Sequence, residues 1–68
     1  MTVEEYLREL RERAGLTKMG PAFDGNILCC DQNHTHFEVP DPDEIPEDAR
    51  RAVLELVISN LAKYALGY

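Results

Sequence analysis

The chain has 68 residues, of which 44% are hydrophobic, and it carries 13 acidic and 7 basic side chains for a formal charge of -6. This length holds a single domain, residues 1–68, because domains rarely fall much below about fifty residues. The negative charge repels nucleic-acid backbones and anionic membranes, so neither is expected as a direct partner.

The start of the chain and its two cysteines favour the cytoplasm. The first residues, MTVEEYLREL, carry acids where a secretory signal needs a basic start and an apolar run. No stretch approaches the roughly 20 apolar residues that span a bilayer. Cys29 and Cys30 are adjacent and cannot close a useful loop, which fits a reducing compartment.

Residues Thr2 to Ala14 predict an amphipathic helix, because apolar side chains recur at helical spacing and charged ones cover the other side. Thr2 and Glu5 form a capping box at its start, and Gly15 supplies the left-handed exit at its end. Opposite charges one turn apart add weak support, in the pairs Glu4/Arg8 and Glu9/Arg13.

A β-hairpin, or a three-stranded meander, is predicted after this helix. Turn-forming and β-branched or aromatic residues divide the segment into alternating turns and strands. The expected elements are a connector at 16–21, a short strand at 22–23, a turn at 24–25, a strand at 26–30, a tight loop at 31–33 and a returning strand at 34–39.

A three-residue loop pairs Cys30 with His34 and fixes which side chains share a face. The core face then carries Ile27, Cys29, Thr35, Phe37 and Val39, and the opposite face carries Leu28, Cys30, His34, His36 and Glu38. A two-residue loop would exchange the two sets of the first strand. The longer loop is preferred because Asn33 tolerates the left-handed conformation that it needs.

A proline-rich segment, residues 40–46, ends the hairpin and leads into a last helix. Pro46 suits the first turn of that helix, which is expected to run to about Leu66. Glu44, Glu47 and Asp48 lie near its start, where the helix dipole favours negative charge. The order of elements predicts an α+β fold of the type α-β-β-(β)-α, with the hairpin or meander packed against both helices.

The last helix is apolar around more than half of its circumference, which exceeds the usual stripe of about 100°. Either the helix lies centrally between the sheet and the first helix, or it leaves an apolar patch for a partner. We expect the second arrangement and a homodimer through this helix. The expected interface consists of Leu54, Val57, Ile58, Leu61, Tyr64, Ala65 and Tyr68.

One cluster has the residue types of a metal site. Cys30, His34 and His36 share one face of the predicted hairpin, and Glu38 is a possible fourth ligand for zinc. The spacing differs from that of known structural zinc sites, so the alternative is that the cysteines pack as small apolar groups and the histidines are partly exposed. No other cofactor is expected.

The segment between residues 38 and 48 is acidic without a basic residue. Asp41, Asp43, Glu44, Glu47 and Asp48 are candidates for binding a basic partner, as a mimic of a nucleic-acid backbone. The alternative is a solvated linker followed by a normally charged helix start.

Catalysis is not expected, because Cys30 beside His34 or His36 is the only nucleophile and base pair that the hairpin offers, and no phosphate-binding glycine loop is present. The sequence therefore favours a small acidic interaction protein that regulates or inhibits another protein. Its size and composition suit a protein of a phage or mobile element. The identity of the partner does not follow from the residues.

Overall fold

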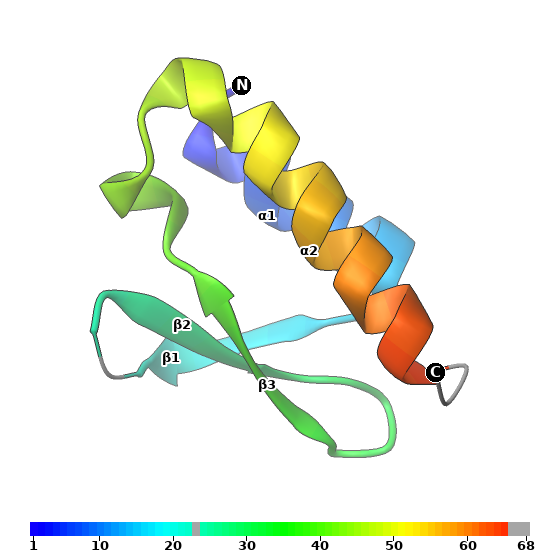
Figure 1. Ribbon diagram of the computed structural model, residues 1–68. Helices are drawn as coiled ribbons and strands as arrows, with labels where there is room; N and C mark the ends of the chain where they lie inside the picture. Colours follow the sequence, from blue (N-terminus) through cyan, green and yellow to red (C-terminus); the bar gives the residue numbers. More distant parts are fainter. Residues whose placement is uncertain (23, 66–68) are drawn as a thin grey trace.

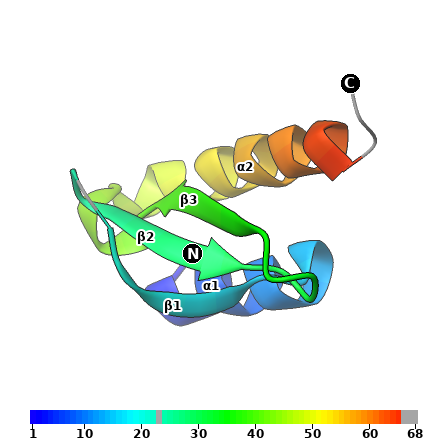
Figure 2. The ribbon, with the colours of Figure 1, turned by 90° about the horizontal axis from the view of Figure 1, so that it is seen from below.

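The computed structural model describes residues 1–22 and 24–65 and confirms the α+β fold (Figure 1). Two α-helices, α1 (Val3–Glu9) and α2 (Arg50–Ala65), lie on the same side of one antiparallel sheet (Figures 1 and 2). The sheet is a meander whose strands lie in the order β1 (Thr17–Pro21), β2 (Asn26–Cys30) and β3 (His36–Pro40). Within the described residues no helix is long and apolar enough to cross a membrane.

Helix α1 begins as predicted. The Glu5 amide donates to the Thr2 hydroxyl oxygen at 3.2 Å, and the Thr2 amide donates to the Glu5 carboxylate at 3.2 Å, which confirms the capping box. These hydrogen bonds also lower the pKa of Glu5. After Glu9 the chain continues as a π-helical segment, η1 (Leu10–Ala14), and ends at Gly15 with a left-handed φ of 66°.

Strand β1 lies where a connector was predicted. The hairpin partner of β2 is Thr17–Pro21, and Ala22 lies outside any strand, so the prediction of a strand at 22–23 is wrong for Ala22, while Phe23 lies outside the described residues. Pro21 is tolerated because β1 is an edge strand, where a missing N–H breaks no ladder. The register also shifts between Lys18 and Gly20, which marks a β-bulge.

Strand β3 begins at His36, two residues later than the predicted returning strand, so residues 31–35 separate β2 from β3 and the predicted loop at 31–33 is too short. Asp31 faces Thr35 and donates to its carbonyl at 3.1 Å, and His34 takes the left-handed conformation (φ 62°) expected for Asn33. Cys30 therefore pairs with His36, and the predicted pairing with His34 is wrong. Because the register moved by two residues, the side chains of β2 and β3 keep their predicted faces, whereas His34 and Thr35 lie in the loop.

The core consists of seven buried apolar side chains, Tyr6, Leu10, Leu16, Ile27, Cys29, Val39 and Leu54. The Tyr6 hydroxyl is buried without a hydrogen-bond partner among the described residues. Burial, with a smaller effect of Cys29 and Asp41, raises the pKa of Tyr6 to about 12. Burial likewise raises the pKa of the Cys29 thiol.

The proline-rich segment forms two 3-10 turns, η2 (Pro42–Glu44) and η3 (Glu47–Ala49), before α2 begins at Arg50. The Arg50 guanidinium holds the first turn of α2 against the preceding segment and the start of the chain. It donates to the carbonyl oxygens of Pro42 at 2.9 Å, of Ile45 at 3.2 Å and of Met1 at 3.0 Å. Helix α2 starts at Arg50, after the turn η3, whereas the sequence predicted a start at Pro46.

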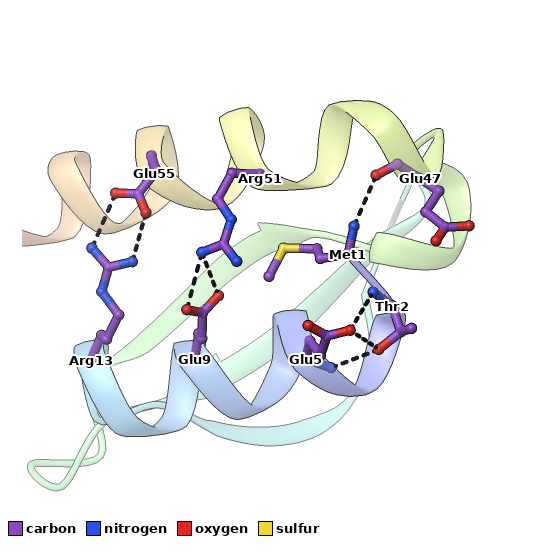
Figure 3. Close-up of polar contacts among 8 residues, drawn as sticks. All are labelled: Met1, Thr2, Glu5, Glu9, Arg13, Glu47, Arg51 and Glu55. Atoms are coloured by element: carbon purple, nitrogen blue, oxygen red, sulfur yellow. Dashed lines mark hydrogen bonds and ion pairs between the residues drawn. The ribbon is translucent and has the colours of Figure 1, made fainter.

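Two ion pairs join the helices along one side (Figure 3). Arg13 donates twice to Glu55, at 2.7 and 3.0 Å, and Arg51 contacts both carboxylate oxygens of Glu9, at 3.0 and 3.1 Å. Glu9 and Arg13 thus bind α2 and not each other, which corrects the predicted pair within the first helix. Because both pairs have the same spacing in sequence, α1 and α2 run in the same direction.

Candidate protein-binding surface

The first residue of the predicted interface, Leu54, belongs to the core. Leu54 is 0% exposed, so it is not available to a partner, and its place in the predicted interface is wrong. The first half of α2 packs inward here because Leu54 joins the same buried cluster as Tyr6 and Val39. The outward large apolar side chains of α2 are Leu56, 62% exposed, and Tyr64, 65% exposed.

A groove runs between β3 and the middle of α2. Its volume is about 240 Å³, and its walls are Glu38, Val39 and Pro40 on the strand side and Val53, Leu56, Val57, Asn60 and Leu61 on the helix side. Among the described residues Glu38 is the only charged one of this lining. Such an apolar hollow beside an exposed leucine is a typical protein-binding feature, whereas a single exposed leucine is not.

One aromatic contact bridges β3 and α2. The rings of Phe37 and Tyr64 meet edge to face, with centroids 5.4 Å apart and planes at 87°. This geometry is the favourable one for two aromatic rings. It holds the second half of α2 above the edge of the sheet.

A second hollow, of about 190 Å³, lies on the other side of α2. Its lining is Arg13, Ala14, Ile58, Leu61 and Ala62. Leu61 therefore borders both hollows, and the second half of α2 forms a ridge between them. The part of α2 around Leu61 is therefore less buried than the part around Leu54.

The other predicted interface residues divide into two groups. Val57, Ile58 and Leu61 are half-buried against the core and border one or both hollows. The side chain of Ala65 and all of Tyr68 lie outside the described residues. The sequence prediction did not include Leu56 or Asn60 among the interface residues, because periodicity alone does not show which edge of a wide apolar arc faces the body.

The acidic segment lies at one end of the molecule, with Asp43, Glu44, Glu47 and Asp48 exposed. Asp41 is half-buried and caps η2 by accepting from the Asp43 amide at 2.9 Å. The Asp41 amide donates to the carbonyl oxygen of Gly25 at 3.2 Å, which brings the β1–β2 turn and its exposed Asp24 to the same end. The carboxylates at this end therefore come from two segments.

The proposed metal ligands do not assemble. Cys30 and His36 face each other across β2 and β3, whereas His34 lies in the loop. Across residues 1–22 and 24–65 no three His, Cys, Asp or Glu side chains are grouped to hold a metal ion. The zinc hypothesis thus has no geometric support in the described residues.

Comparison with family models, with curated proteins and with solved structures gave no match to this chain.

Proposed function

We propose that this chain is a small protein-binding module that regulates or inhibits another protein by occupying part of its surface. The observation that carries this proposal is the exposure of Leu56 and Tyr64 beside the groove between β3 and α2. Apolar surface of this kind gains free energy when a partner removes it from water. We further propose the cytoplasm as its location, supported by the unbonded thiols of Cys29 and Cys30.

Site-specific photocrosslinking in the cells that carry this gene tests the proposal. A photoreactive phenylalanine replaces Leu56 in one variant and Met19 in a matched control. Met19 is also an exposed large apolar residue, at 51%, but it lies on β1, away from the groove. We expect a protein adduct from position 56 and none from position 19. Absence of an adduct at position 56, in cells where the variant is folded, would refute a binding function for this surface.

The mass of the adduct also decides between two kinds of partner. An adduct of twice the chain mass indicates the homodimer expected from the sequence, and any other mass indicates a different protein. The formal charge of -6 makes two copies repel each other, so a different protein is favoured.

A second candidate is that the acidic end occupies a basic groove of its partner. It is favoured by Asp24, which joins the exposed carboxylates of the acidic segment. Replacing Asp41, Asp43, Glu44, Glu47 and Asp48 by the matching amides should then remove the crosslinked adduct without unfolding the protein. An unchanged adduct would discard this candidate.

A further inference from the structure

The outer edge of β3 offers backbone hydrogen-bonding groups in an unbroken register. The Asp31 amide donates to Thr35, and the Asp41 amide donates to Gly25, at the two ends of the β2–β3 ladder. Bonded and non-bonded pairs alternate along an antiparallel ladder. Phe37 and Val39 therefore direct their N–H and C=O groups toward β2, and His36 and Glu38 direct theirs out of the sheet.

The other edge of the sheet is less suited to pairing. In β1, Pro21 lacks an N–H and a bulge interrupts the register between Lys18 and Gly20. Such features are the usual means by which proteins prevent strand addition. On β3 the only comparable residue is Pro40, at the end of the strand.

Helix α2 lies beyond β3, on the side away from β2, so that it overhangs the position of the next strand (Figure 2). The groove with its apolar walls occupies this position. A strand added beside β3 would place alternate side chains under Val53, Leu56 and Val57. Its other side chains would lie on the outer face beside Glu38.

We propose that β3 and α2 bind a short extended segment of another protein, which adds to the sheet as a fourth, antiparallel strand with apolar residues alternating with basic ones. The apolar residues fill the groove, and a basic residue faces Glu38, since opposite charges across a strand pair are stabilising. An acidic segment is disfavoured by Glu38 and by the charge of -6. This inference rests on the proposed function and specifies the partner.

A second copy of the chain is disfavoured as the occupant of this edge. Because α2 lies beyond β3 (Figure 2), pairing of two β3 edges in an antiparallel sheet would bring the two α2 helices to the same side of that sheet, above its centre, where they would compete for the groove. Each copy would also bring a charge of -6. An isolated segment of a different protein brings neither a second α2 helix nor a second charge of -6.

The test uses one synthetic peptide, acetyl-Lys-Val-Lys-Val-Lys-Val-Lys-amide, and a scrambled peptide of the same composition. Binding is measured by NMR on the ¹⁵N-labelled protein. We expect the alternating peptide to bind with a Kd of about 1 mM or tighter and to shift the amide signals of His36 and Glu38, with no such shifts from the scrambled peptide. Absence of binding, or equal binding of both peptides, would overturn the inference.

Methylation of the peptide backbone tests strand addition directly. In an antiparallel pair, residues opposite His36 and Glu38 share their outer face, so the lysine N–H groups are those that bond to β3. N-methylation of the lysines should abolish binding, and N-methylation of the valines should leave it unchanged. Any other pattern would contradict the antiparallel arrangement.

Variants of Glu38 separate the backbone from the side chain. Glu38→Pro removes the outward N–H together with the carboxylate, leaves the β2 ladder intact and should weaken binding at least about tenfold, so its loss beyond that of Glu38→Gln reports the backbone hydrogen bond. Glu38→Gln keeps the N–H and should weaken binding about two- to fivefold. Equal affinities for Glu38→Pro and the wild type would refute the inference.

Failure of the inference and failure of the proposed function are distinguishable. If the peptide does not bind while position 56 still crosslinks to a protein, the partner does not add a strand to β3. If position 56 gives no adduct, the surface has no protein-binding role, whatever the peptide shows.

Discussion

The two halves of α2 meet the rest of the molecule in different ways. The first half is anchored, because Leu54 is fully buried and Arg50 donates to three backbone carbonyls. The second half stands between two hollows and exposes Tyr64, and Leu56, just before the middle of the helix, is exposed as well. One amphipathic helix thus has a buried side as well as an exposed side, and Leu54 and Leu56, only two residues apart, differ fully in burial.

The largest expected effect is a loss of stability when the buried leucine of α2 is truncated. Leu54→Ala should lower the free energy of unfolding by about 2 to 5 kcal/mol, because it leaves a cavity in the core. A domain of this size rarely has more than about 3 to 5 kcal/mol in total, so this variant should be largely unfolded. Urea unfolding followed by circular dichroism measures the change, and a loss below about 1 kcal/mol would show that Leu54 does not anchor the helix.

The core that packs against the first half of α2 should also make the free energy of unfolding depend on alkaline pH. Tyr6 has a pKa of about 12 in the folded protein against 10.0 in the unfolded chain, so above pH 10 the unfolded state releases a proton that the folded state keeps. Stability therefore falls as pH rises. At pH 12 the loss from Tyr6 is about 2 kcal/mol, and Tyr6→Phe should not show it.

Comparison of wild type and Tyr6→Phe in urea at pH 7 and at pH 11 to 12 isolates this contribution, because both proteins share every other titrating group. At pH 7 the phenylalanine variant should be at least as stable as the wild type, since it removes a buried hydroxyl without a described partner. Parallel pH profiles would contradict the burial of the hydroxyl.

Arg50 should matter more than its neighbour Arg51. Arg50→Met leaves the carbonyl oxygens of Pro42, Ile45 and Met1 without their donor and should cost about 1 to 2 kcal/mol. Arg51→Met removes an exposed ion pair with Glu9 and should cost less than about 1 kcal/mol. Equal losses in thermal or urea unfolding would mean that the start of α2 is not held by the partly buried Arg50 guanidinium.

The smallest effect is expected on the exposed side of the helix. Leu56→Ala should change the free energy of unfolding by no more than about 0.5 kcal/mol, because an exposed side chain leaves little cavity. The same substitution should reduce the affinity for a partner that occupies the groove. A large loss of stability would show that Leu56 belongs to the body of the protein and not to its surface.

Local signals were predicted well from the residues. The capping box of Thr2 and Glu5 and the left-handed Gly15 depend on neighbours within a few positions, and both are present. The strand faces were also predicted, since alternation needs only the parity of the register. The strand at 17–21 was not predicted, because Gly20 and Pro21 are turn residues in general and are tolerated here by the edge position.

The candidate site was predicted in part. The sequence indicated an apolar excess on the last helix, but it named Leu54 and omitted Leu56. A helical wheel gives the angle between these residues and not the direction of the core. The direction of the core depends on where β3 and α1 lie, and a local sequence pattern contains no information about these positions.

The amino-acid sequence alone determined the kinds of element, the polarity of each face and the acidity of the chain, because these follow from spacing and composition. Only the tertiary structure decided which edge of the sheet remains open, which part of α2 is buried and which charges meet across helices, as Arg13 and Glu55 do. These features depend on contacts between residues far apart in the chain, whose geometry is set by packing of the whole domain.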